Sequence, residues 1–322
     1  MARFLIRRVI LGAVVIWLVT VMVFAIFFVG PGPQDVAHRL AGREATPQQV
    51  AEVAKRLDLD KPLLQQYGHF ISQLLQGNLG YSYIHGQPVT HVLKEAFPIT
   101  LSLALGAAAI WLVIGVFSGV ISAVRRGSIL DRSVTTIALV FYSVPVFVLG
   151  LLMLELFFYI FSVHGVTRFF PGGGYTYFTG SPYQWFRHLI LPWIALALIS
   201  AATYTRLTRS TMLEVMGEDY IRTARAKGLP ERRVVYRHTL RSALTPVVSQ
   251  FGIDVGTLLG GAILTEYTFS MPGLGYTVVN AIGQQDLPVV IGITIVATVA
   301  VVIANILVDV AYAVLDPRVR LH

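Results

Sequence analysis

The 322-residue chain is 55% hydrophobic and 13% charged, with a mean hydropathy of +0.68. This composition is too apolar for a soluble domain of that size and predicts an integral membrane protein. The net charge of +8 is compatible with nucleic-acid binding or with cations gathered on cytoplasmic loops, and the absence of cysteine excludes disulfides, thiolate metal sites and a cysteine nucleophile.

Six apolar runs approach or exceed the roughly 20 residues needed to cross about 30 Å of hydrocarbon. They cover residues 9–29, 99–124, 134–162, 189–205, 247–265 and 288–314. Arg3, Arg7 and Arg8 precede the first run, as in a signal peptide, but the run is too long and no Ala-x-Ala cleavage site follows it. We therefore expect six transmembrane helices, the first of them uncleaved.

Cations are distributed unevenly among the loops. They gather at the N-terminus, between the second and third runs, and above all between the fourth and fifth runs, whereas residues 266–287 contain no Lys or Arg. This asymmetry predicts that both termini are cytoplasmic, and it favours topology over nucleic-acid binding as the explanation of the net charge.

The first external loop, residues 31–97, carries helix signals of its own. Thr46 to Gln49 is typical of a capping box with proline at the first helical position. A second amphipathic helix is predicted to open at Pro62 and to end at Gly77. We expect a small helical insertion outside the membrane, although these helices could instead lie on the lipid interface. The predicted organisation is residues 1–30, the insertion 31–97, and a five-helix core 98–322.

Two of the apolar runs contain informative residues. Pro145 is predicted to bend the third helix because proline removes a backbone donor. In the fifth, Gly252, Gly256 and Gly260 share one face, which should allow close approach of a neighbouring helix. The opposite face is a candidate translocation path and carries Gln250, Asp254, Thr257 and Gly261. A membrane-embedded Asp254 is costly without water or a partner, so it either lines a path or makes a structural hydrogen bond between helices.

The fourth loop, residues 206–243, contains a short charged helix at 219–229. Asp219 is expected to cap its first turn, Arg225 and Lys227 suit its C-terminal end, and Gly228 suits the left-handed residue that ends it. A break at 228–230 and Pro246 at the start of the next membrane helix predict a rigid elbow. The segment is thus predicted to be a handle for a soluble partner, the alternative being an idle basic loop on anionic lipid.

Recognisable catalytic chemistry is missing. The eight histidines are scattered, and neither His-Glu-x-x-His nor Gly-x-Ser-x-Gly occurs. The Gly-x-x-x-x-Gly-Lys-Ser/Thr phosphate-binding motif is also absent. If the protein drives transport, the energy must come from another subunit or from an ion gradient.

The residues from Asp219 to Leu229, followed by His238-x-Leu240-Arg241-x-Ala243-Leu244-x-Pro246, resemble the EAA loop of ABC importer permeases of the dipeptide, oligopeptide and nickel branch. The resemblance extends over nearly the whole chain. It includes Ser143-x-Pro145-x-Phe147-x-x-Gly150, His188-Leu-Ile-Leu-Pro192, Leu258-Leu-Gly-Gly-Ala262, Glu266-x-x-Phe269-x-x-Pro272-Gly-x-Gly275, Asp286-x-Pro288, Leu57-Asp-Leu-Asp60-x-Pro62 with Gln66-Tyr67, and Gly77-Asn-Leu-Gly80-x-Ser82. The long first loop is similar to that of the B-type subunit of the permease pair.

This resemblance implies an all-α ABC importer permease fold in the bacterial inner membrane. It further implies a homologous second permease, one or two cytoplasmic ATPases that hold ATP and Mg, an extracytoplasmic substrate-binding protein, surrounding lipid, and neither nucleic acid nor a cofactor in this chain. The implied ATPase-coupling residues are Asp219, Tyr220, Arg222, Thr223, Ala224, Arg225, Ala226, Lys227, Gly228 and Leu229, with Ala224 and Gly228 as the tightly packed members. Glu266 joins the candidates for the translocation path.

Four residues depart from the expected pattern. Thr223 and Arg225 replace the Glu and Ala of the wider motif, Ser242 replaces Asn, and Gln285 replaces an Arg before Asp286. The favoured hypothesis is a permease for short peptides. The alternatives are import of nickel or another small solute, a stand-alone gradient-driven carrier or channel, and a membrane enzyme.

Overall fold

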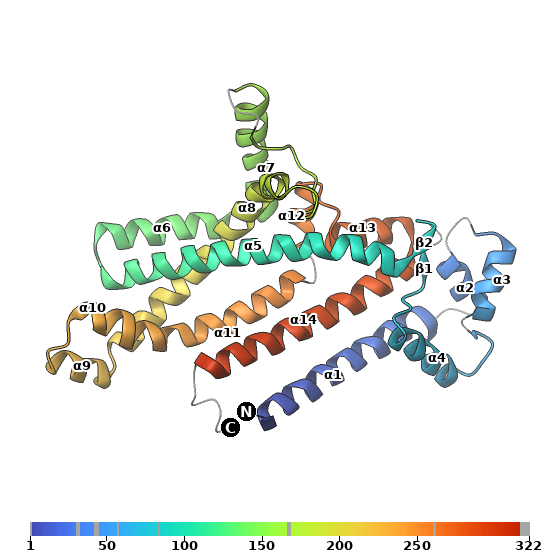
Figure 1. Cartoon of the computed structure of the whole chain (residues 1–322), viewed down its shortest axis with the longest axis horizontal. Coiled ribbons are helices and arrows are strands. Elements are labelled where there is room, and N and C mark those ends of the chain that lie inside the picture. Colours follow the sequence, from blue (N-terminus) through green and yellow to red (C-terminus); the bar gives the residue numbers. More distant parts are fainter. Residues whose placement is uncertain are drawn as a thin grey trace.

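The computed structural model describes residues 2–29, 33–41, 45–56, 58–82, 84–165, 169–259 and 262–315. This part of the chain is built almost wholly of helices (Figure 1). The strands within it are β1 (Tyr81–Ser82) and β2 (Gln87–Pro88), which pair antiparallel with Ser82 opposite Gln87. Gly260 and Gly261, both named above, lie outside the described residues.

Each of the six predicted runs corresponds to helical structure. The elements are α1 (Ala2–Phe24) with η1 (Ala25–Val29), α5 (Val89–Val124), α6 (Ile129–Ser143) with α7 (Val146–Met153) and η2 (Leu154–Val163), α8 (Pro182–Met216), α11 (Leu240–Leu259) and α14 (Leu287–Leu315). Among the described residues, four helices are long and apolar enough to cross a membrane, namely α1 with η1, α5, α8 and α14, and the bent pair α6 and α7 would be a fifth. The twenty residues of α11 include Arg241, Gln250 and Asp254, which lower its hydropathy.

The third run bends where Pro145 predicts it. Its two helical parts meet at 99°, and Val144 between them is extended, with φ −91° and ψ 126°. A residue before proline avoids the helical conformation because the proline ring crowds it. The bend is therefore confirmed, and Figure 1 shows α7 projecting away from the long helices α5 and α6.

Small residues let the long helices approach closely. A Cβ atom built on Gly115 of α5 would lie 2.3 Å from the Cβ of Tyr204 on α8. One on Gly252 of α11 would lie 2.4 Å from Val308 Cγ1 of α14, and one on Gly256 would lie 3.4 Å from Asn305 Oδ1. The predicted glycine face of the fifth membrane helix thus packs against α14, as close helix pairs in membranes require.

The segment between the first two membrane helices forms α2 (Pro33–Ala41), α3 (Pro47–Arg56) and α4 (Leu63–Leu75). The predicted capping box is present, since the Thr46 backbone N–H donates to Gln49 Oε1 at 2.8 Å. Helix α4 ends before Gly77, whose φ is +76°. The sequence did not predict α2. Helix α5 already begins at Val89 and passes through Pro98, and the boundary at residue 97 between the insertion and the core stays a prediction.

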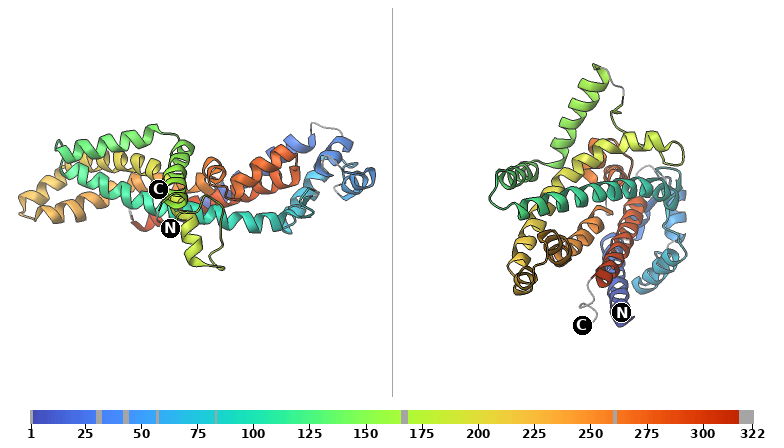
Figure 2. Two further views of the ribbon diagram at one scale, coloured as in Figure 1. Left: turned by 90° about the horizontal axis from the view of Figure 1, so that it is seen from above. Right: turned by 60° about the vertical axis from the view of Figure 1, so that its left-hand side comes forward.

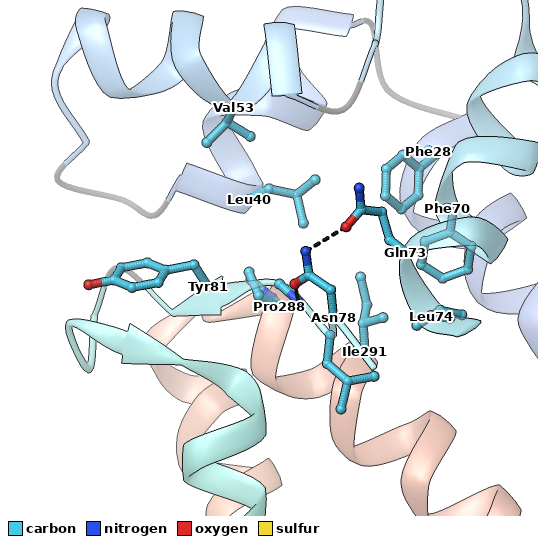
Figure 3. Close-up of a pocket in the computed structure, with 12 residues that line it drawn as sticks. Phe28, Leu40, Val53, Phe70, Gln73, Leu74, Asn78, Tyr81, Pro288 and Ile291 are labelled. Atoms are coloured by element: carbon cyan, nitrogen blue, oxygen red, sulfur yellow. Dashed lines mark hydrogen bonds between the residues drawn. The ribbon is translucent and has the colours of Figure 1, made fainter. Parts of the chain in front are cut away.

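These three helices pack on the C-terminal end of the first membrane helix and on the N-terminal end of the last one. Phe24 and Phe28 of α1 and η1, Val53 of α3 and Ile291 of α14 belong to one buried apolar cluster, to which α4 also contributes. A cavity of about 100 Å³ remains between α2, α3, α4 and α14. Figure 3 shows it, with the Gln73 and Asn78 side chains joined by a hydrogen bond of 2.5 Å.

The insertion and the fourth loop lie at opposite ends of the molecule. Figures 1 and 2 place α2, α3 and α4 at one end of the long axis and α9 (Asp219–Ala226) with α10 (Glu231–Arg233) at the other. Between them the long helices run side by side. Helix α9 therefore lies at the same end of the molecule as the C-terminus of α5, which Arg125 and Arg126 follow in the chain.

Candidate coupling helix and membrane polar network

Helix α9 begins differently from the prediction. The N-cap residue is Glu218, which is extended and whose side chain makes no capping hydrogen bond. Asp219 already has helical backbone, its side chain is 97% exposed, and it lies 3.5 Å from Arg222. The prediction that Asp219 caps the helix was therefore wrong, because the chain turns into the helix one residue earlier. Its negative charge still lies at the positive end of the helix dipole.

The other end of α9 matches the prediction. Gly228 has φ +75°, its N–H donates to Arg225 O at 2.9 Å, and the Leu229 N–H donates to Ala224 O at 3.3 Å. This pair of bonds is the Schellman arrangement that ends many helices. A Cβ on Gly228 would meet nothing within 4 Å, so within this chain glycine is required by the backbone and not by packing. Tight packing of Gly228 against a partner stays a prediction.

One narrow face of α9 is buried. Ile221 and Ala224 pack with Val234 and Leu229 in a small apolar cluster. The remaining coupling candidates are exposed, namely Asp219, Tyr220, Arg222, Thr223, Arg225, Ala226, Lys227 and Gly228. The helix is therefore anchored by two side chains and offers the rest of its surface outward.

Side-chain bonds fix α9 to the segments that follow it. The Arg225 guanidinium makes two bonds to the Glu231 carboxylate, at 2.8 and 3.1 Å, across the turn between α9 and α10. This guanidinium holds the pKa of Glu231 below its ordinary value. The Tyr220 hydroxyl also donates to Ser242 Oγ of α11, at 3.1 Å. These contacts tie α9 to α10 and to the start of α11.

The fourth loop is more helical than the sequence indicated. Residues 206–216 belong to α8, and α10 continues through η3 (Val234–Thr239) into α11. Pro246 was expected to start a helix, but it lies inside α11, so that expectation was wrong. A proline within a helix is tolerated at the cost of one backbone bond. Only residues 217–218 and 227–230 separate α9 from the helices on either side of it.

A polar network joins α8 to α11 at the level of Asp254. The Tyr204 hydroxyl donates to Asp254 Oδ2 at 2.8 Å, and Gln250 Nε2 donates to Asp254 Oδ1 at 2.8 Å. Tyr204 is fully buried, Asp254 is half-buried, and Thr257 is exposed one turn further along. The Asp254 carboxylate thus has hydrogen-bond partners on both helices and is also partly exposed. Both predicted roles, lining a path and joining two helices, stay predictions.

Glu266 lies apart from this network. It sits on α12 (Ile263–Thr268), is 0% exposed, and accepts from Thr100 Oγ1 at 2.6 Å and from the Tyr276 N–H at 2.8 Å. Tyr276 belongs to α13 (Leu274–Gln284), so Glu266 links α5, α12 and α13. Burial raises its pKa. The structure does not bring Glu266 together with the other path candidates.

Two polar clusters were missed by sequence reasoning. Asp131 accepts from Arg209 Nε at 2.8 Å and from Arg209 Nη2 at 3.0 Å, and it also binds Ser122. Asp286 accepts from Ser82 Oγ at 2.5 Å and lies 3.1 Å from His85 Nδ1. Both clusters join residues distant in sequence. Arg209 is one of the cations between the fourth and fifth apolar runs, and no local sequence pattern pairs it with Asp131.

The fold and this site define a multi-span helical membrane protein with an exposed helix between two of its spans. The chain belongs to the family described as the binding-protein-dependent transport system inner membrane component, whose model matches residues 113–321. The model of the N-terminal part of such membrane components matches residues 1–104. The protein is therefore an inner-membrane permease of the ABC transporter class.

Curated relatives are similar over their whole length. The Di/tripeptide transport system permease protein DppB of Pseudomonas aeruginosa (strain UCBPP-PA14) is 43% identical, with 99% of each chain covered. The Dipeptide transport system permease protein DppB of Escherichia coli (strain K12) is 38% identical, again with 99% of each chain covered. The probable peptide ABC transporter permease protein y4tP of Sinorhizobium fredii (strain NBRC 101917 / NGR234) is 37% identical over 99% of this chain and 100% of its own.

A solved structure has the same fold over the core. A chain of the inward-facing MetNI methionine ABC transporter superposes with a TM-score of 0.55, covering 70% of this chain and 96% of that chain at 22% identity. This likeness concerns the fold alone.

Proposed function

We propose that the protein is the membrane subunit of an ATP-driven importer of short peptides. Full-length relatives at 37–43% identity that are named as peptide permeases support the substrate class. In this proposal the chain pairs with a homologous second permease, receives substrate from an external binding protein, and docks one or two ATPases that hold ATP and Mg. Both termini, together with α9, face the cytoplasm.

The observation that carries the proposal is the exposed but anchored helix α9. Its buried residues Ile221 and Ala224 fix it to the chain, and its exposed side chains are available to a partner. A partner that moves during ATP hydrolysis would displace α9 as a unit. The displacement would reach α8 through residues 217–218, and α11 through the Arg225–Glu231 and Tyr220–Ser242 bonds.

Displacement of α8 and α11 would alter the contact between these two helices within the membrane. Tyr204 and Asp254 join the two helices, with Gln250 beside them. We propose that Gln250, Asp254 and Thr257 border the translocation path and that α8 and α11 shift relative to each other during transport. The ATPase drives the shift only if it binds the two arrangements with different free energy.

Blocking the exposed face of α9 tests this proposal. Ala226 is exposed and makes no anchoring contact, so Ala226→Trp should leave the chain folded while preventing an ATPase from docking. The expected result is normal membrane yield, loss of the copurifying ATPase, and loss of labelled di- and tripeptide uptake. Gln48→Trp, an exposed change on α3 at the other end of the molecule, is the matched control for yield and ATPase copurification. Retention of the ATPase and of uptake in Ala226→Trp would contradict the docking role.

A further inference from the structure

A cavity lined mainly by residues with polar side chains lies between α6 and α8, and neither α9 nor Asp254 contributes to its lining. Its volume is about 520 Å³, and its lining consists of Thr135, Tyr142, Thr203, Arg206, Leu207, Arg209 and Ser210. The two α6 residues are seven positions apart, and the α8 residues follow the spacing of a single helix face. The cavity is therefore a groove between two facing helix surfaces.

The groove carries one uncompensated positive charge. Arg209 is neutralised by Asp131, with two bonds of 2.8 and 3.0 Å. Arg206 is exposed and makes no ion pair with any residue the structure describes; its guanidinium carbon lies 5.6 Å from the centre of the Tyr142 ring. All seven lining residues are described, and none of them is acidic. Such a site favours an anion.

The depth of the groove corresponds to a membrane interface. Arg206 directly follows the apolar run of α8, and the paired Asp131 and Arg209 lie close to the end of α5, where Ser122 contacts Asp131. On α6, Leu139 lies between Thr135 and Tyr142 on the same helix face and is 46% exposed, so it provides apolar surface beside the groove. Cationic groups at this depth, beside apolar surface, suit a lipid phosphate with its acyl chains.

The groove faces away from the proposed translocation path. Arg206 is two positions after Tyr204, and two helical positions correspond to a rotation of about 200° around the axis. Tyr204 points toward Asp254 of α11, so Arg206 is directed to the other side of α8. A transported molecule bordering Asp254 would not meet Arg206.

We propose that the α6–α8 groove binds the phosphate group of an anionic phospholipid in the leaflet on the α9 side. The Arg206 guanidinium binds the phosphate oxygens with its planar donors, as arginine does in other phosphate sites. The acyl chains lie along Leu139 on the same face of α6. This site is separate from the docking of an ATPase and from peptide transport.

Lipid binding can be measured on the permease purified in mild detergent with whatever subunits copurify with it. Native mass spectrometry would give the affinity for added phosphatidylglycerol, with phosphatidylcholine as the zwitterionic comparison. Arg206→Gln should weaken phosphatidylglycerol binding about tenfold, because a charged hydrogen-bonded contact is lost. Arg206→Lys should retain part of the affinity. Ser210→Trp, which fills the groove and keeps the charge, should weaken binding as well.

The control is Arg132→Gln, which removes one exposed cation from α6 outside the groove. It should leave the affinity within about twofold of the wild type, because a solvated surface charge contributes little. Equal losses in Arg132→Gln and Arg206→Gln would overturn the proposal in favour of general surface attraction. Competition by millimolar inorganic phosphate would identify a free-phosphate site, and displacement of lipid by a tripeptide would place the groove on the transport route. Either result would overturn the lipid assignment.

Discussion

At the residue scale, the backbone conformation at position 228 is what requires a glycine there. Its φ of +75° costs an L-residue about 1–2 kcal/mol, although there is open space for a side chain. Gly228→Ala should therefore lower the stability of the α9 end and reduce ATPase copurification without a steric clash. Thermal unfolding and pull-down of the ATPase measure these effects. Gly283→Ala, where the space is also open and φ is not positive, should lower neither.

Asp254 is the second residue whose role can be decided by substitution. Asp254→Asn keeps the shape of the side chain but removes its charge. If the carboxylate borders the path, peptide uptake should fall at least severalfold while the yield of folded complex is maintained. Tyr204→Phe removes only the structural hydrogen bond and should cost about 1 kcal/mol of stability. A fall in yield with Asp254→Asn, matched by Tyr204→Phe, would assign Asp254 to helix packing instead.

Local chemistry made some single residues predictable and others not. The Gly228 turn, the Thr46 capping box and the Pro145 bend each depend on a few neighbouring residues, and all three are present. The Arg209–Asp131 pair joins positions 78 apart in sequence, so only the folded chain brings them together. The prediction that Asp219 is the cap was wrong because α9 begins one residue earlier than expected. Glu218 therefore occupies the cap position.

At the scale of elements, substitution on the glycine face of α11 tests how closely α11 packs against α14. A Cβ on Gly252 would lie 2.4 Å from Val308 Cγ1, which is too close without movement of α14. Gly252→Ala should therefore destabilise the protein by about 1–3 kcal/mol, the usual effect of overpacking. The double variant Gly252→Ala with Val308→Ala should recover part of that loss. Thermal unfolding in detergent measures both, and strictly additive losses would show that the two side chains do not meet.

Hydrophobic length and pattern predicted where the membrane helices lie, but not all of their ends. The apolar runs of α5 and α8 indicated the membrane-spanning part of each helix. Both helices extend beyond these runs into segments with charged and polar residues. Helix α10, η3 and α11 likewise continue through Pro246. Continuation of this kind is set by packing against neighbouring elements, which composition does not record. The short helix α2 was not predicted because its start, unlike that of α3, carries no Ser or Thr capping box.

At the scale of the whole molecule, the proposed topology separates the insertion from α9 by the membrane. The two lie at opposite ends of the long axis in both Figure 1 and Figure 2. The uneven distribution of Lys and Arg supports a cytoplasmic α9, because cations near membrane helices are retained on that side. The arrangement would let α9 meet an ATPase while α2, α3 and α4 meet an external protein.

The absence of native cysteine makes this topology directly measurable. Glu52→Cys places a thiol on exposed α3, and Ala226→Cys places one on exposed α9. A membrane-impermeant maleimide should label Glu52→Cys in cells whose outer barrier alone is opened, and should label Ala226→Cys only after the inner membrane is permeabilised. Uptake by each variant checks that the chain remains assembled. Labelling of Ala226→Cys before permeabilisation would place α9 outside, where no ATPase could reach it.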